Sequence, residues 1–145
     1  MILFGNRLSF LTLTLTLACL AGCGKSSGIE KVVVTGMVTL DGQPIPNGEI
    51  RFIPTSGTPG PISGGAIKEG QYVAQGRGGV PLGNHQVDIR AYRVKAKGPG
   101  QAGSIDAEGG PAVQYLDAKY NERTTLTAEI DATTQTKDFE LTSGK

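Results

Sequence analysis

The spacing of apolar residues along this chain changes near residue 31. Before that point, residues 8–21 form an uncharged run made mainly of Leu, Thr and Ala. After it, short runs alternate apolar with polar residues, and clusters of Gly, Pro, Asp and Asn separate the runs. A period of two predicts strands with one buried face, and the clusters predict turns. The chain therefore divides into an apolar leading segment and a β domain.

Seven strands are predicted in the β domain, and the clearest is 84–93, where Val87, Ile89 and Ala91 alternate with polar residues. No stretch repeats apolar residues at convincing helical spacing, so the pattern favours an all-β fold, either an antiparallel sandwich or a barrel. The expected strand ranges are 31–40, 49–53, 65–68, 71–75, 84–93, 124–131 and 135–142. The inward positions predict one shared core, which contains Val34, Val38, Phe52, Val87, Ile89, Leu126, Ile130 and Phe139.

One long segment, 94–118, is rich in Gly, Ala and Pro and keeps no steady period. Segments of this length in a small domain are usually functional or mobile. We expect residues 97–110 to be mobile and mostly unpaired. The second half should be tied down where Tyr115 or Tyr120 packs against the sheet, and residues 112–116 are expected to form a short strand or a helical turn.

The leading segment has the properties of a secretory signal. Arg7 is the only charged residue before Lys25, and the apolar run of 8–21 follows it. A basic start, an apolar run and small residues at its end define such signals. The run is shorter than the about 20 apolar residues that a membrane-spanning helix needs. A signal segment is therefore predicted over residues 1–22.

The end of this run, Leu20-Ala21-Gly22-Cys23, resembles the lipobox of bacterial lipoproteins. The resemblance implies that residues 1–22 are removed and that Cys23 carries a diacylglyceryl group and further acyl chains such as palmitate. Residues 23–30 would be the lipidated cysteine and a flexible tether, and 31–145 the domain. The protein would then face the periplasm or the cell exterior on a membrane of the cell envelope. The alternatives are an ordinary secretory signal with chance cysteines and a soluble intracellular protein.

The charge and cysteine content of the chain limit the classes of partner and the sources of stability that we expect. The chain has 14 basic and 13 acidic residues, and loss of residues 1–22 removes only Arg7, which leaves 13 of each. A formally neutral domain lacks the basic footprint of nucleic-acid binding, so we expect no nucleic acid and a membrane contact made through the lipid. Cys19 would be removed and Cys23 modified, which leaves no cysteine for a disulfide. Stability must then come from the apolar core.

Three stretches of the domain, in order, resemble motifs of the carboxypeptidase regulatory-like domain. Residues 35–45, TGMVTLDGQPI, are similar to its G-x-V-x-x-x-G-x-P-[IL] motif, and Gly70-Gln71-Tyr72 is similar to its G-x-Y. Residues 81–87, PLGNHQV, are similar to its P-x-G-x-Y-x-V, with His85 at the usual tyrosine position. The resemblance covers about residues 32–142. It implies a seven-stranded antiparallel Greek-key sandwich of the transthyretin (prealbumin) type.

A fourth element adds to this resemblance. Lys119-Tyr120-Asn121 looks like the K-Y-N element of small envelope lipoproteins that carry this domain. Those proteins often have Pro two positions before the Lys, where this chain has Asp117. The resemblance therefore does not extend to the geometry of the turn before Lys119.

The residues give little support for catalysis, metal binding or a cofactor. A hydrolytic triad needs a nucleophile, a base and an orienting group, but His85 is the single histidine of the chain, and we expect it to be structural or on the surface. The acidic pairs Asp106/Glu108 and Asp138/Glu140 are interpreted as solvated charges rather than a calcium site. The Gly-rich stretch 76–79 lacks the G-K-[ST] ending of a phosphate loop. We expect a protein that is not an enzyme and needs no cofactor.

Two functions remain for the domain. Similar domains commonly act as accessory modules, which favours a structural or protein-interaction role with an envelope protein. The alternative is a ligand-binding module, with a glycan as the ligand. The chain has no Trp, so the aromatic candidates for glycan contact are Tyr92, Tyr115 and Tyr120.

Overall fold

The computed structural model describes residues 28–55, 57–94 and 112–144, and these residues form an all-β domain. Their helical content is limited to two 3-10 turns, η1 (Gly76–Gly78) and η2 (Ala118–Tyr120). Within these ranges no helix has the length and apolar character needed to cross a membrane. The predicted signal segment, Cys23 and the expected mobile stretch 97–110 lie outside the described residues.

The predicted strands all appear, several with shifted ends. They correspond to β2, β4, β5, β6, β8, β10 and β11, and short strands are added beside them. Of the two forms expected within residues 112–116, the structure shows the short strand, which is β9. The strands are β1 (Lys31–Val32), β2 (Val34–Leu40), β3 (Gln43–Pro44), β4 (Asn47–Pro54), β5 (Ser63–Lys68), β6 (Gln71–Ala74), β7 (Val80–Pro81), β8 (Gly83–Val94), β9 (Ala112–Gln114), β10 (Thr127–Ile130) and β11 (Phe139–Leu141).

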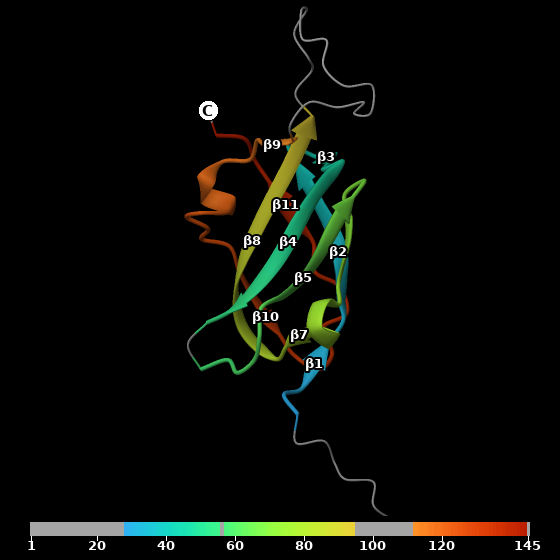
Figure 1. Cartoon of the computed structure of the whole chain (residues 1–145), viewed down its shortest axis with the longest axis vertical. Helices are drawn as coiled ribbons and strands as arrows, with labels where there is room; N and C mark the ends of the chain where they lie inside the picture. The colour runs from blue at the N-terminus through green and yellow to red at the C-terminus, as the bar shows by residue number, and fades with distance from the viewer. Residues whose placement is uncertain (1–27, 56, 95–111, 145) are drawn as a thin grey trace, which may run out of the picture.

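Most of the strands belong to one continuous sheet with the order β10-β8-β4-β5-β6-β2-β11 (Figure 1). β3 pairs with β2, β9 pairs with β8, and β1 and β7 form a separate two-stranded sheet. The neighbours are antiparallel except β2 and β11, which are parallel. The expectation of a purely antiparallel sheet is therefore wrong at this edge. The stretch from β10 to β11 crosses the molecule, so β11 runs in the direction of β2.

The alternation of β4 and β8 sets the register at the centre of the sheet. Ile50 lies opposite Ile89, and Phe52 lies opposite Val87. All four side chains are fully buried on one face. Directly opposed apolar side chains are the unit of sheet stabilisation, and a shift by one residue would place them in water.

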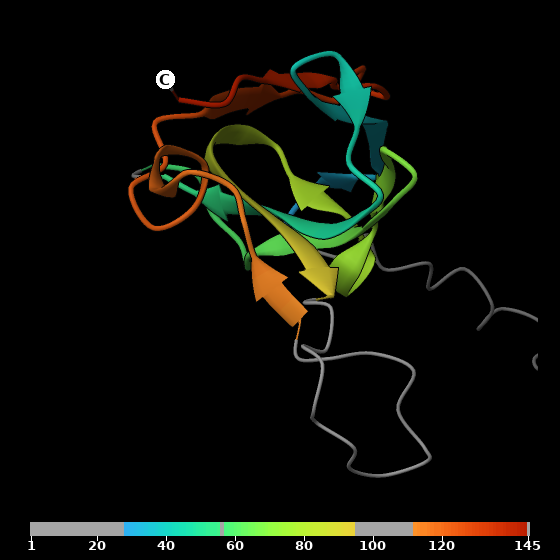
Figure 2. The same cartoon turned by 90° about the horizontal axis from the view of Figure 1, so that it is seen from above.

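The sheet curls around its apolar face. Phe52 of β4, Tyr72 of β6 and Phe139 of β11 lie on strands that are not neighbours in the sheet, yet their ring centroids lie 6.2–6.4 Å from one another. Figure 2 shows β11 on one side of the core and β8 with β5 on the other. The aromatic cluster therefore joins the two halves of the curled sheet.

The predicted core is confirmed except at Leu126, which is half-buried and packs against the rim of the core. Leu126 precedes β10, and its N–H donates a 3.2 Å hydrogen bond to Thr124 Oγ1 instead of to a neighbouring strand. The core is also larger than expected. The additional fully buried side chains include Ile45, Ile67, Ala74, Val80, Ala91 and Leu141.

The structure corrects two predictions, the extent of the last strand and the exposure of the outer face of β8. The last strand is expected over 135–142, but its regular part is β11, preceded by an isolated parallel bridge between Thr35 and Thr136. Between the two, the Asp138 carboxylate replaces a main-chain acceptor and takes the N–H of Met37 at 2.7 Å. The outer face of β8 is expected to be wet, but Asp88 is 5% exposed. Its carboxylate lies between Arg51, at 3.6 Å, and Arg90, at 3.3 Å. The two guanidinium groups cover it and balance its charge.

The two ends of the domain differ in what they carry. The start of the described chain, β1, β7 and η1 lie at one end, which we call the entry end (Figure 1). The last residues of β8, together with β3 and β9, lie at the opposite end. A tether on the N-terminal side of β1 would therefore hold the entry end, and not the end with β3 and β9, close to its attachment point.

Candidate functional site

The three candidate tyrosines do not form one exposed platform. Tyr120 is 8% exposed, and its hydroxyl donates a 2.8 Å hydrogen bond to the main-chain oxygen of Thr142. Tyr120 is therefore poorly placed for the expected ligand contact, because its ring belongs to the core and its hydroxyl is used internally. Tyr120 instead fixes η2 to the chain after β11, as the sequence analysis expected of Tyr115 or Tyr120.

Tyr115 lies beside Tyr120 but is half-buried. The guanidinium carbon of Arg93 lies 5.4 Å from the centre of its ring, which is within the range of a cation–π contact. Both tyrosines line a small cavity of about 70 Å³ together with Leu40 and Thr142. A water molecule occupies about 30 Å³, so this cavity has room for water but not for a sugar ring.

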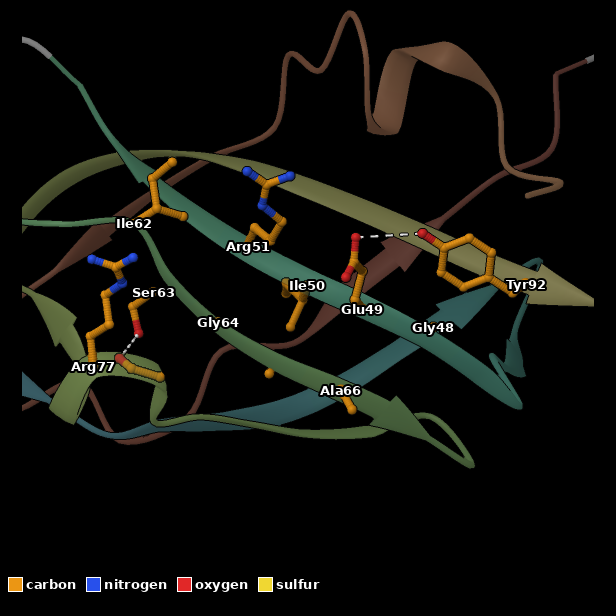
Figure 3. A pocket seen from close by; sticks show the side chains of 12 residues that line it. Gly48, Glu49, Ile50, Arg51, Ile62, Ser63, Gly64, Ala66, Arg77 and Tyr92 are labelled. Atoms are coloured by element: carbon orange, nitrogen blue, oxygen red, sulfur yellow. Dashed lines mark hydrogen bonds between the residues drawn. The ribbon is translucent and has the colours of Figure 1, made fainter. Parts of the chain in front are cut away.

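Tyr92 lies elsewhere, at the edge of a wider hollow on the outer face of β4 and β5 (Figure 3). Its hydroxyl donates a long, 3.5 Å hydrogen bond to the carboxylate of Glu49. Ile62 and Arg77 lie at the other end of the hollow from Tyr92. The volume is about 420 Å³, within the about 300–1,000 Å³ of small-molecule pockets.

The hollow exists because β5 carries almost no side chains on this face. On the outer face, Gly64 lies opposite Arg51 of β4, and Ala66 lies opposite Glu49. A Cβ at Gly64 would overlap the main-chain oxygen of Ile50, so the close approach of the two strands requires glycine there. The same residue that permits the strand pairing therefore leaves the floor of the hollow open.

The walls of the hollow are mixed in charge. Arg51 is paired with Asp88, and Glu49 with the hydroxyl of Tyr92. Arg77 is exposed in η1 and has a positive φ of 54°, and its main-chain oxygen accepts a 2.8 Å hydrogen bond from Lys31 Nζ. Among the described residues no carboxylate forms an ion pair with the Arg77 side chain. The hollow thus offers one aromatic ring, one aliphatic side chain and one guanidinium group to a ligand.

His85 is a core residue and lies outside this hollow. Its imidazole is fully buried, its Nδ1 is 3.1 Å from the main-chain oxygen of Gly83, and its ring packs edge-on at 6.2 Å from Phe52. Nδ1 therefore carries the proton, and Nε2 has no hydrogen-bond partner among the described residues. Burial lowers the pKa of His85 below its usual value.

The remaining acidic candidates have local roles. Asp138 caps the N–H of Met37, whereas Glu140 is exposed on β11. Asp106 and Glu108 lie outside the described residues. In the part of the chain that the structure describes, no three His, Cys, Asp or Glu side chains lie close enough together to hold a metal ion.

The hollow was not found by sequence reasoning, although Tyr92 was. Arg51 and Arg77 were not among the candidate residues, and the relevant signal was the run of small residues Gly64-Gly65-Ala66 at the start of the strand expected over 65–68. The chain matches no family model, no curated protein and no solved structure.

Proposed function

We propose that this chain is a lipid-anchored protein of the bacterial cell envelope, with its β domain as a non-catalytic structural or protein-interaction module. The observation that carries the proposal is Leu20-Ala21-Gly22-Cys23, directly after an uncharged apolar run that follows Arg7. Each buried methylene of an acyl chain contributes about 0.8 kcal/mol, so two or more chains on Cys23 would hold the protein stably on a membrane.

We further propose that the curled sheet is a transthyretin-like Greek-key sandwich of the carboxypeptidase regulatory-like kind. What supports this is that its motif residues have interlocking structural roles. The N–H of Gly70, which has a positive φ of 81°, donates a 2.7 Å hydrogen bond to the oxygen of Ile45. Gly36 lies where a Cβ would overlap the oxygen of Lys137, against the ring of Tyr72. The motifs thus join β2, β6 and the chain before β11.

Substitution of each cysteine tests the anchoring in cells. Cys23→Ser removes the thiol that the lipid would modify, and the protein is expected to leave the membrane fraction or to keep residues 1–22. Cys19→Ser is the matched control, because Cys19 lies inside the predicted signal and should be dispensable. Equal membrane retention of both variants, with residues 1–22 removed from both, would contradict the proposal.

A second candidate function is glycan binding in the hollow beside Tyr92. The observation in its favour is an aromatic ring, a glycine floor and the Arg77 guanidinium around a volume of about 420 Å³. Binding of the purified protein to a glycan array tests it. Tyr92→Ala should abolish any signal, whereas Tyr115→Ala, a tyrosine outside the hollow, should retain it. A signal that neither substitution changes would exclude the hollow as its source.

A further inference from the structure

The entry end of the domain exposes aliphatic side chains next to the point where the chain enters. Ile29 is 45% exposed and Ile62 is 41% exposed. The two belong to one surface, because Ile29 lies beside Gly60: a Cβ at Gly60 would lie 3.3 Å from Ile29 Cγ2 and 2.6 Å from Pro81. The loop 57–62 therefore extends the surface that begins at Ile29.

This surface has few charges. The described residues of loop 57–62 contain none, and the stretch 76–84 contains only Arg77. Lys31 reaches the same place, since its Nζ donates to the main-chain oxygen of Arg77. The nearby carboxylates are Glu30, which is exposed, and Asp131, which accepts hydrogen bonds from Thr133 and Thr134 within its own turn. The surface is thus aliphatic at its centre, with two cations at its rim.

A lipid on Cys23 would hold this end next to the bilayer. Five residue steps separate Cys23 from residue 28, and an extended chain spans at most about 3.6 Å per residue, or about 18 Å in total. The headgroup layer on one side of a bilayer is itself about 5–8 Å thick. Once the lipid is inserted, the short tether makes contact between this surface and the bilayer intramolecular, at an effective concentration in the millimolar range. Even a weak affinity for lipid would then keep the surface in contact.

We propose that the entry end rests on the lipid surface, with Ile29 and Ile62 at the boundary between headgroups and acyl chains and with Lys31 and Arg77 facing lipid phosphates. This inference rests on the proposed lipid anchor at Cys23. Aliphatic side chains flanked by cations are the usual composition of surfaces that lie in this interface. The contact fixes the orientation of the domain, so that β3 and β9 point away from the membrane towards partners.

Depth-dependent quenching tests the orientation in the full lipidated protein, reconstituted in vesicles of phosphatidylethanolamine and phosphatidylglycerol. A fluorescent label is placed at Pro59→Cys, in the exposed loop of the entry end, or at Gln43→Cys, exposed on β3 at the opposite end. Cys23 would be blocked by its lipid, so the label has one site. Nitroxide-bearing lipids should quench the Pro59→Cys label several-fold more strongly than the Gln43→Cys label.

Two failures are distinguishable in this experiment. Protein that floats with the vesicles but shows equal quenching at both sites overturns the orientation and leaves the anchor intact. Protein that no longer floats with the vesicles overturns both the anchor and the inference that rests on it.

A pair of matched substitutions tests the contact itself. Ile62→Asp should lower quenching of the Pro59→Cys label several-fold, because it places a carboxylate among headgroup phosphates. Val113→Asp makes the same kind of change on β9 at the opposite end, where Val113 is 40% exposed, and should leave quenching unchanged. Both residues are exposed, so urea unfolding should show both variants folded. Unchanged quenching in folded Ile62→Asp overturns the proposal.

Discussion

The hydroxyl of Tyr72 donates a 2.6 Å hydrogen bond to the main-chain oxygen of Lys137, which lies 65 residues further along the chain. Burial, followed by the charge of Asp138, raises the pKa of Tyr72, so the hydroxyl remains protonated and remains a donor. Gly36 of β2 lies between the two partners, where a side chain would overlap the Lys137 oxygen. One hydrogen bond therefore connects β6 to the entry of β11 across β2.

Tyr72→Phe tests how much this hydrogen bond contributes to the free energy of unfolding. The substitution keeps the ring in the core but leaves the Lys137 oxygen without its partner, which should cost about 1–3 kcal/mol of unfolding free energy. Tyr92→Phe is the matched control, because its hydroxyl makes only a long contact with Glu49 at a half-exposed site, and it should cost less than about 0.5 kcal/mol. Urea unfolding followed by circular dichroism measures both. Equal effects would contradict the assigned role of Tyr72.

Phe139→Ala tests the aromatic cluster that joins the halves of the sheet. The ring is buried against Phe52 and Tyr72, so its removal should leave a cavity and cost about 3–5 kcal/mol. Val113→Ala, on exposed β9, should change stability by less than about 0.5 kcal/mol. A loss below about 1 kcal/mol for Phe139→Ala, measured by urea unfolding, would show that β11 is not packed on the core as described.

Stability should fall as the pH is lowered through the range in which His85 titrates. Burial lowers the pKa of His85 in the folded protein, whereas the unfolded chain keeps a value of about 6.5. Below pH of about 6.5 the unfolded chain therefore binds a proton that the folded protein does not. The free energy of unfolding is therefore highest above about pH 6.5 and falls as the pH is lowered towards the folded pKa. The slope is at most about 1.4 kcal/mol per pH unit.

The single histidine makes this pH dependence assignable. His85→Phe should remove the slope that begins below about pH 6.5, while carboxylates such as Asp41 and Asp131, whose pKa values are lowered by their hydrogen bonds, titrate at lower pH. Urea unfolding at a series of pH values measures the slope. A slope that persists in folded His85→Phe would mean that another group takes up the proton.

The segment between β8 and β9 should tolerate shortening. Val94 is paired with Ala112, so the two ends of the segment are already adjacent. Deletion of residues 99–109 leaves six residues to connect them, and closure entropy changes slowly with length, so stability should change by less than about 1 kcal/mol. Any partner or glycan binding that needs the segment should be lost. A larger loss of stability on urea unfolding would show that these residues make structural contacts.

Protection from hydrogen exchange gives an independent view of the same segment. Residues 97–110 are expected to be mobile, so their amides should exchange at little free-energy cost, whereas those of β8 should be protected. Strong protection from Gly100 to Gly110 would contradict this expectation.

The strands were predictable because their signal is local. Alternation in β4 and β8 reports directly on which side chains are buried, and the turn residues between strands report on chain reversal. Leu126 was misplaced because the hydrogen bond of its N–H to Thr124 Oγ1 precedes the regular strand, whereas the apolar alternation in the sequence already includes Leu126. The parallel pairing of β11 with β2 depends on where a strand arrives after crossing the molecule, which local periodicity does not encode.

The candidate site was less predictable for the same physical reason. Tyr120 and Tyr92 have the same chemistry in the sequence, but one ring is buried with its hydroxyl bound to Thr142, and the other borders the hollow. The hollow itself depends on how closely Gly64 approaches the main chain of Ile50. Such contacts between distant strands become visible only when the sheet is assembled.

The measurement that tests the central claim most directly is the mass of the N-terminal peptide of the native protein, purified from bacterial membranes. The account predicts that the mature chain begins at Cys23 and that this residue carries a diacylglyceryl group with an additional acyl chain on its amine. A mature chain that retains Met1, or an unmodified Cys23 at its N-terminus, would contradict it.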